Sequence, residues 1–382
     1  RNISFYGRLS YSYDSRYMLQ ATIRRDGSSV FGDGHQWGYF PSISGAWNIT
    51  EEKFMEGLKE SLSLSNLKLR IGYGVSGNAL GFGAYSAVAT YGANGTIISI
   101  GGKDYPTLVS TKLANPDLKW EKTGMLNIGL DYAFFNGRLN GSIEYYNKVT
   151  KDLIWNYPVT SFLYPFSTIS ANVGEITNRG IEISINAIPV QNKNFTWTTT
   201  LNLSHNKNKV NKLTNEKFST ASFTQGDPMV AGVSAEGYTQ QIMEGEPLGT
   251  FFTYEFAGYD EDGTSVYYEH DAETGARTGT TTKAPKFKDR AVTGCAQPKL
   301  NMGWNNTFSY KNWSASFFFT GVFGNKIYNG LRAHYTAPDF FAGGKNVLKE
   351  FITERPATDK SSNVPSDKFI ENGSYVRLQN LT

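Results

Sequence analysis

The residues that could take part in chemistry lack the spacing that catalysis or metal binding requires. Gly72, Gly74 and Gly77 form a GxGxxG, but no helical pattern follows them, and a dinucleotide site needs a helix that opens at the third glycine. Cys295 is the only cysteine, which excludes an internal disulfide framework and a cysteine-based zinc site. The four histidines are far apart, at His35, His205, His270 and His334. We therefore predict no catalytic residue, no cofactor and no metal, and a protein that is not an enzyme.

Acidic and aromatic residues outside the expected strands are weaker candidates for ligand contact. Asp260, Asp262 and Asp271 could hold calcium, but they lack the spacing of an EF-hand loop, and turn chemistry around Gly263 is the alternative. Aromatic rings in loops can stack on a sugar ring or pack a peptide side chain, although they can equally pack the loops against one another. The substrate-binding candidates of this kind are Tyr105, Trp155, Tyr164 and Phe166.

Residues 119–208 show the pattern of the strands that must position these loops. Apolar and polar residues alternate there with a period of two, as in a β-strand, where successive side chains point to opposite faces. One face of the first such strand holds Leu126, Ile128, Leu130, Tyr132 and Phe134. The strands are longer than the usual length of about five or six residues. We therefore expect a two-faced sheet that spans something thick.

The composition of the 382 residues excludes several classes of protein. Lys and Arg number 37 against 34 Asp and Glu, and this near balance argues against a nucleic-acid surface. No run approaches the roughly 18 apolar residues of a membrane helix. A transmembrane barrel is still allowed, because a barrel strand hides its apolar residues at every second position.

Short corners and long loops alternate along the chain. We expect about 13 strands, including a pair near residues 237–243 and 248–256, and a hairpin within 76–118. Short helices are expected at TEEKFMEGLKE, with Thr50 as the N-cap, and at KNVLKEFITE. Outer-membrane barrels have short periplasmic and long extracellular connections, so the alternation predicts a transmembrane antiparallel β-barrel. Aromatic residues at strand ends fit its interfacial girdles: Tyr13, Tyr17, Trp37, Phe134, Trp197, Tyr310 and Trp313.

Several motifs resemble those of one family. They include RRDGSSVFG, WGYFPSISGAWNI, LKLRIGYGVSGN, NPDLKWEKT, NVGEITNRGIEISINA and GEPLGTFFTYEFAGYD. In collinear order over essentially the whole chain, they resemble the barrel of a SusC/RagA-type TonB-dependent outer-membrane transporter of the Bacteroidota. The resemblance implies a barrel of about 22 strands, plugged from inside. Residues 1–382 would then be part of the C-terminal β-barrel domain, with the plug, the TonB box, the early strands and the closing strands outside the chain.

The resemblance also implies a function and partners. Such proteins import nutrients, either glycans or peptides, across the outer membrane, with a SusD-like surface lipoprotein as a lid. TonB-ExbB-ExbD would act through the N-terminal region, outer-membrane lipid would surround the wall, and no nucleic acid would bind. Many relatives carry a DxNxDG-like turn after GYD, where this chain reads DEDGTSVYYEH, so no calcium site is carried over.

In this picture the two faces of each strand have different surroundings. Ser184, Asn186 and Asn202 would face a wet lumen, whereas lipid would cover Leu130, Ile183 and Leu201. Two other classes remain open. One is a passive porin or an enzymatic outer-membrane barrel, which would lack a plug and a TonB box, and the other is a soluble all-β binding protein.

Overall fold

The computed structural model describes residues 1–79, 83, 85–159, 166, 168–220, 222–225, 238–354 and 363–382. The chain divides into two compact units. The wall unit comprises Arg1–Ser204, Val210–Ala221 and Asn305–Ser316, and the loop unit comprises His205–Lys209, Ser222–Trp304 and Phe317–Thr382. Strands predominate among the elements of both units, as the all-β prediction required.

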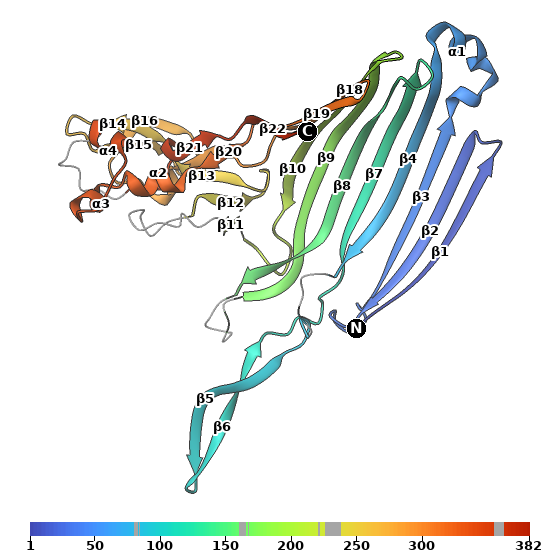
Figure 1. Ribbon diagram of the computed structural model, residues 1–382. Helices are drawn as coiled ribbons and strands as arrows, with labels where there is room; N and C mark the ends of the chain where they lie inside the picture. The colour runs from blue at the N-terminus through green and yellow to red at the C-terminus, as the bar shows by residue number, and fades with distance from the viewer. Residues whose placement is uncertain are drawn as a thin grey trace. The chain divides into compact units, whose positions relative to one another are not determined.

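The largest sheet has 11 strands in the order β1-β2-β3-β4-β7-β8-β9-β10-β18-β19-β22. Its strands are β1 Asn2–Tyr13, β2 Tyr17–Ser28, β3 Trp37–Asn48, β4 Leu64–Asn78, β7 Glu121–Phe134, β8 Leu139–Pro158, β9 Thr168–Gln191, β10 Phe195–Lys212, β18 Leu300–Tyr310, β19 Trp313–Phe323 and β22 Tyr375–Leu381. Strands β1 to β4 and β7 to β10 lie side by side as long ribbons (Figure 1). The 24 residues of β9 correspond to about 80 Å at ~3.3 Å per residue. The predicted long, antiparallel strands are therefore confirmed.

Connections in the wall unit are short at one end of the strands and long at the other. At the short end, tight turns join β1 to β2, β7 to β8, and β9 to β10. Left-handed backbone makes the turn after β7, with φ of 55° at Phe135, 55° at Asn136 and 82° at Gly137, so the expected Asn136-Gly137 corner is present. At the other end, long connections follow β2, β4 and β8. The predicted alternation of short and long connections is thus found within this unit except between β3 and β4, where residues 49–63 form a long connection at the short end.

The β3–β4 connection at the short end carries the first expected helix, with a different start. Two 3-10 turns, η1 Ile49–Glu51 and η2 Lys53–Met55, precede α1 Glu56–Leu62. Thr50 is not the N-cap, because its hydroxyl donates to Asn48 Oδ1 at 2.7 Å and the residue before α1 is Met55. Ser63, with a φ of 48°, ends the helix in the left-handed conformation.

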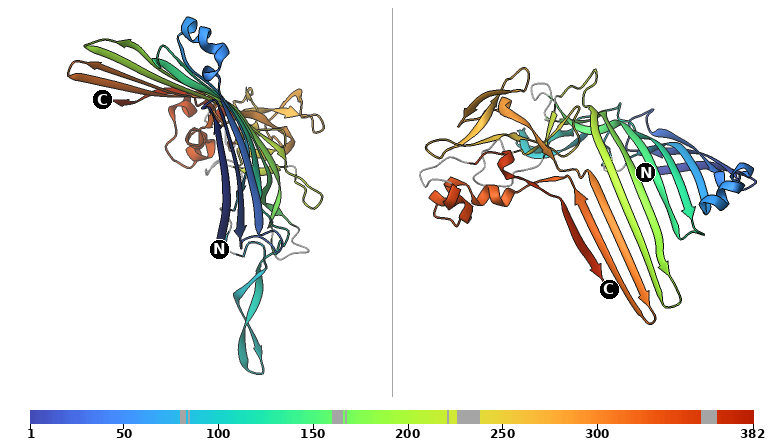
Figure 2. Two further views of the ribbon diagram at one scale, coloured as in Figure 1. Left: turned by 90° about the vertical axis from the view of Figure 1, so that its right-hand side faces the viewer. Right: turned by 90° about the horizontal axis from the view of Figure 1, so that it is seen from above.

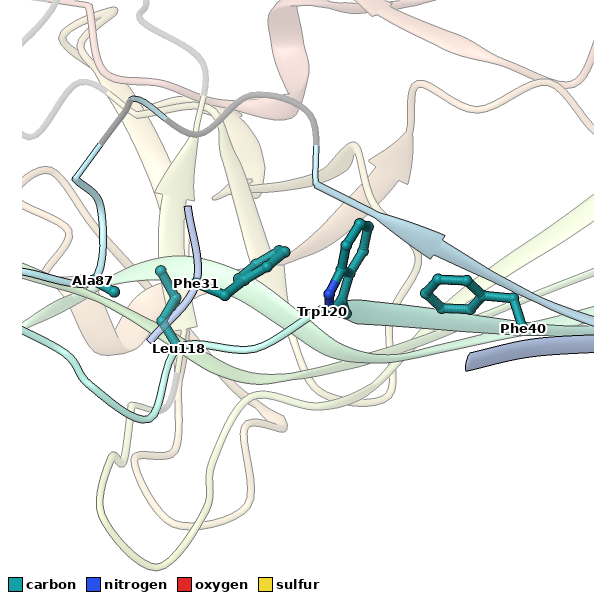
Figure 3. Packing of buried hydrophobic residues seen from close by; sticks show 5 residues of the cluster. All are labelled: Phe31, Phe40, Ala87, Leu118 and Trp120. Carbon is teal, nitrogen blue, oxygen red and sulfur yellow. The ribbon is translucent and has the colours of Figure 1, made fainter. Parts of the chain in front are cut away.

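The long β4–β7 connection contains the expected hairpin, β5 Thr90–Ile100 and β6 Lys103–Lys112. The hairpin extends away from the ends of the neighbouring strands (Figures 1 and 2). At its base, the side chains of Phe31, Phe40, Ala87, Leu118 and Trp120 form a buried apolar cluster (Figure 3). Trp120 is central, with its ring centroid 4.9 Å from Phe31 and 5.4 Å from Phe40, and its indole N–H donates to the Gln36 carbonyl at 3.0 Å. The cluster therefore fixes the long connections to the strand ends.

The loop unit contains smaller sheets that the β10–β18 and β19–β22 connections build. A four-stranded sheet has the order β11-β12-β13-β17 and a three-stranded sheet the order β14-β15-β16, while β20 pairs with β21. The strands are β11 Ser222–Gln225, β12 Gln240–Met243, β13 Thr250–Tyr254, β14 Phe256–Tyr259, β15 Ser265–His270, β16 Arg277–Thr282, β17 Arg290–Cys295, β20 Lys326–Tyr328 and β21 Ile370–Asn372. The helices are α2 Gly330–Tyr335, α3 Pro338–Ala342 and α4 Lys349–Glu354, with 3-10 turns η3 Phe287–Asp289 and η4 Asp367–Phe369.

Two predictions from the sequence differ from the structure of the loop unit. The strand pair expected near 237–243 and 248–256 exists as β12 and β13, but it belongs to the four-stranded sheet, so the large sheet has two strands fewer than counted. The helix expected at 345–354 begins only at Lys349. None of the described helices combines the length and the apolar character that a membrane crossing requires.

Candidate functional site on the polar face of the large sheet

One face of the wall unit, here the outer face, is apolar and exposed. Strand register aligns on it Tyr11, Leu19, Gly45, Ile71, Ile128, Tyr145 and Ile181. Ile71 is 51% exposed and Ile181 45% exposed, although residues of this type are usually buried. Leu130 and Ile183 lie on the same face, each opposite Ile143. A contiguous apolar surface of this extent needs an apolar covering such as lipid.

The opposite face, here the inner face, is polar. Residues adjacent in sequence to those of the outer face align on the inner face through the strand register. They are Ser10, Gln20, Ser44, Gly72, Asn127, Tyr146 and Gly180. A hollow of about 590 Å³ lies over β1 to β4 and β7, lined by residues that include Gln20, Ser44, Arg70 and Asn127. This face is therefore suited to contact water and polar solutes.

A cluster of charges lies at the centre of the inner face. The guanidinium of Arg70, on β4, donates from Nε to Asp131 Oδ2 at 2.8 Å and from Nη2 to Asp131 Oδ1 at 2.7 Å. The same Nη2 donates to Glu144 Oε1 on β8 at 2.8 Å. A Cβ on Gly129 would lie 2.9 Å from Arg70 Nη2, so the glycine leaves room for the guanidinium. Glu144 faces Glu182 across β8 and β9, which makes the cluster net negative.

Amide groups continue the inner face toward the short connections. Asn186 Nδ2 donates to Asn140 Oδ1 at 3.2 Å, and the Thr200 hydroxyl donates to Asn186 Oδ1 at 2.9 Å. Asn186 and Ser184 line a hollow of about 400 Å³ together with Asp131. Asn202 shares the face of Thr200 by alternation, and Leu201 then points to the opposite face. The predicted division of these residues between a polar and an apolar face is thus present in the structure.

The aromatic residues predicted for the girdles lie at or near strand ends. Tyr13 ends β1 opposite Tyr17, which begins β2, and Trp37 begins β3. Phe134 ends β7, Tyr310 ends β18 and Trp313 begins β19, while Trp197 is the third residue of β10. Sequence reasoning missed Trp47, which faces Tyr17, and Tyr39, which faces Arg25. Trp47 lies in register with Tyr17, and Tyr39 shares a face of β3 with Trp37, so strand pairing and alternation were the missing signals.

The four aromatic substrate-binding candidates do not form one site. Tyr105 lies in β6 on the extended hairpin, opposite Ile98, and is 49% exposed. Trp155 lies in β8 within the large sheet, opposite Ala171. Phe166 is partly exposed in the β8–β9 connection. Tyr164 lies outside the described residues.

The carboxylates considered for calcium serve turns and ion pairs instead. Asp260 pairs with Lys283 and accepts the Thr264 N–H at 2.7 Å, and the ion pair holds the pKa of Asp260 below its usual value. Asp271 accepts the Thr274 N–H at 2.8 Å, which likewise lowers its pKa. In the part of the chain that the structure describes, no group of His, Cys, Asp or Glu has an arrangement that could hold a metal ion.

The charge cluster itself was not singled out from the sequence. Arg70, Asp131 and Glu144 are far apart along the chain, and each looks like an isolated polar residue within an alternating strand. Only the register of β4, β7 and β8 brings them together. The sequence did offer one signal. Residues of opposite charge occupy polar positions in expected strands that are neighbours in the sheet.

Together, the exposed apolar face, the polar inner face and the aromatic strand ends define the wall of an outer-membrane β-barrel. Residues 1–321 match the family described as TonB dependent receptor-like, beta-barrel. The chain belongs to this family, and it is an outer-membrane protein.

Relatives and a solved structure agree with this assignment. TonB-dependent receptor P3 of Formosa agariphila is 33% identical over 405 residues, covering 100% of this chain and 38% of that protein. TonB-dependent receptor SusC of Bacteroides thetaiotaomicron is 32% identical over 386 residues, covering 100% of this chain and 37% of that protein. The structure of the RagAB peptide transporter is similar, with a TM-score of 0.81 and 25% identity, over 100% of this chain and 40% of that one. The chain therefore spans less than half the length of these proteins.

Proposed function

We propose that this chain forms part of the wall and several long loops of a nutrient importer of the SusC/RagA type. The observation that carries the proposal is a polar inner face, with the charges of Arg70, Asp131 and Glu144, on a wall whose other face is apolar. In a TonB-dependent receptor barrel, such a face lines the space through which a polar solute passes. Because the chain covers about two fifths of its relatives, we assign the plug, the TonB box, the early strands and the closing strands to other parts of the protein.

The proposed cargo is a glycan or a peptide, moved without covalent chemistry on it. Support for a peptide comes from the similarity to the RagAB peptide transporter. The energy source is TonB-ExbB-ExbD, as the family membership suggests. Aromatic rings at Tyr105, Trp155 and Phe166 are proposed to contact cargo or the lid, and Tyr164 is kept as a candidate.

The proposed partner is a SusD-like lipoprotein that covers the mouth of the barrel. The β5–β6 hairpin supports such a contact, because Ile100 is 65% exposed and Leu108 72% exposed. Apolar side chains occur on both faces of this hairpin, since Ile97 and Ile98 are neighbours on one strand. A two-stranded hairpin is only marginally stable in water by itself. Contact with a protein partner would cover these side chains.

Uptake measurements test the transport proposal. Cells that express the full-length protein are given labelled oligopeptides and oligosaccharides, with TonB present or deleted. We expect uptake of one class only when TonB is present. Barrel assembly in both strains is checked by heat-modifiable electrophoretic migration. Equal uptake without TonB would identify a passive pore and contradict the proposal.

Co-purification tests the partner separately. The double substitution Ile98→Ser and Leu108→Ser should reduce the amount of lipoprotein that co-purifies, because it removes apolar contact area from the hairpin. Thr107→Ser, on the same hairpin, is the matched control and should behave as the unmodified protein. Retention of the lipoprotein by both variants would assign its contact to other loops.

A further inference from the structure

Charged side chains are distributed unevenly over the outer face of the wall unit. In β1 to β4 and β7 to β9, register and alternation place on this face the cationic residues Arg25, Lys122, Lys151 and Arg179. Among the described residues of these strands, Glu175 shares this face, and Asp152, beside Lys151 in the bulge of β8, pairs with Lys119 at 3.0 Å. The four cationic residues and Glu175 lie in the half of their strand nearest the long connections. The outer face therefore carries a cationic band at one edge.

Two lysines in this band face each other directly. Lys122 on β7 is the register partner of Lys151 on β8, and like charges at facing positions destabilise a strand pair. Lys151 Nζ lies 3.9 Å from Glu175 Oε2. Lys122 is exposed and has no ion pair with any described residue. One carboxylate thus faces two ammonium groups, and one positive charge of the lysine pair is left unbalanced.

The surroundings of the band are those of a membrane interface. The Arg25 guanidinium lies 4.3 Å from the ring centroid of Trp37 and 5.3 Å from that of Tyr39, and such rings are typical of head-group depth. From Lys122 to Tyr132 the strand runs for about 33 Å, which at a tilt of about 40° spans about 25 Å of height, the height of an apolar barrel band. Lys122 therefore lies at one edge of the apolar band, with Tyr132 near the other edge.

We infer that Lys122 and Lys151, with Arg179 and Arg25 beside them, bind the phosphate of anionic lipid head groups in the leaflet next to the long connections. The ammonium groups donate to phosphate oxygens, which removes the repulsion between the lysines. Arg179 lies four residues from Glu175 along β9, toward the short connections, and long arginine side chains extend along apolar surface toward polar surroundings. This inference rests on the placement of the wall in the outer membrane and does not depend on transport.

Lipid retention by the full-length protein tests the inference. The protein is reconstituted in phosphatidylcholine vesicles with or without phosphatidylglycerol, and the retained lipid is measured by native mass spectrometry. Lys122→Gln with Lys151→Gln should reduce retention of phosphatidylglycerol by roughly tenfold, since each charge near the surface contributes to lipid attraction. Lys68→Gln with Lys148→Gln makes the same charge change on the inner face and should leave retention unchanged.

The rate of unfolding gives a second readout, and the expected effect of the charges differs between the two lipid compositions. In phosphatidylcholine alone, the Lys122 and Lys151 double variant should unfold no faster than the unmodified protein, because it lacks the lysine repulsion. With phosphatidylglycerol, the unmodified protein should unfold more slowly than this variant. Equal retention by both variants, or the same stabilisation by inorganic phosphate in detergent, would overturn the inference. Failure of TonB-dependent uptake would leave this result unaffected, because the two measurements are independent.

Discussion

The wall unit and the loop unit place apolar side chains in opposite environments. In the wall unit, residues such as Ile43 and Ile71 are more than half exposed on a long sheet. In the loop unit, Tyr254 is 1% exposed and packs its ring 6.2 Å from that of the buried Tyr267. The first arrangement needs an apolar solvent, and the second resembles a water-soluble domain with its own core. One chain thus combines two kinds of fold that depend on different solvents.

The most deeply buried carboxylate among the described residues lies in the loop unit. In the loop unit, Asp289 is 1% exposed, and its carboxylate accepts the N–H groups of His270 at 2.9 Å and Lys286 at 2.8 Å. Glu255 accepts two hydrogen bonds from Arg277, of 2.8 and 2.6 Å, and lies 2.8 Å from His270 Nε2. In the wall unit, the cluster around Arg70 is only partly buried on the inner face. We therefore expect the loop unit to depend strongly on specific polar contacts of buried carboxylates.

The largest expected effect comes from a charge on the outer face of the wall. Ile128→Arg should lower the free energy of unfolding by about 2–4 kcal/mol, because Ile128 lies near the middle of the apolar band on β7. Asn127→Arg, one residue earlier on the inner face, should cost much less. The measurement is reversible unfolding of the full-length protein in lipid vesicles. Equal costs at both positions would contradict the assignment of the two faces.

Removal of a buried carboxylate should affect the loop unit alone. Asp289→Ala leaves the buried N–H of His270 without an acceptor, which should cost about 1–3 kcal/mol. Hydrogen exchange should then lose protection in residues 238–299 and keep it in β7 to β9. Asp262→Ala is the control, since Asp262 is exposed and its ion pair with Lys283 is 3.5 Å long. Loss of protection across the wall would show that the two units unfold together.

Acid should destabilise the loop unit before the wall. Hydrogen bonds from Arg277 hold the pKa of Glu255 below its usual value. Burial acts to raise the pKa of Asp289, but Lys288 and backbone N–H groups lower it overall. Groups with lowered pKa values stabilise the fold above their unfolded pKa of about 4, and this stability is lost as the pH falls through the folded value.

One loop carboxylate opposes this trend. Burial raises the pKa of Asp367, so protonation of Asp367 adds stability as the pH falls and offsets part of the loss from Glu255 and Asp289. Hydrogen exchange at pH 7 and in steps below about pH 4 measures the effect. We expect faster exchange first in residues 238–299, and simultaneous loss in β7 to β9 would contradict the comparison.

The smallest expected effect concerns a polar group on the outer face of the wall unit. The indole N–H of Trp197 donates to Asn306 Oδ1 at 3.0 Å, and Asn306 is buried. Trp197→Phe removes this donor and should cost about 1 kcal/mol in unfolding free energy. Trp313→Phe is the matched control, because Trp313 is 80% exposed. A larger cost for Trp313→Phe would reverse the ranking.

The sequence predicted the wall well because its signal is local. Alternation at Leu126 to Phe134 and the corner at Asn136-Gly137 depend on neighbouring residues, and both are found. The β12–β13 pair was also recognised as strands, but its assignment to a separate sheet depends on β17, which follows about 40 residues later. The cluster of Arg70, Asp131 and Glu144 could not be predicted without the strand register. Asp131 and Glu144 lie 61 and 74 residues after Arg70 in the sequence.

The β10–β18 connection has a consequence for how such proteins diversify. It leaves the large sheet after β10 and returns at β18, the next strand in the sheet order. Between these points it builds small sheets with buried residues of their own, among them Phe251, Tyr254 and Tyr267. Gene segments that encode such a connection can be exchanged or lengthened without altering the pairing of the strands on either side. Recombination at the ends of β10 and β18 would thus transfer these sheets and keep the strand pairing of the host wall. The host's β19–β22 connection would have to supply the contacts that Pro365 and Asp367 make with Tyr254 and Phe256.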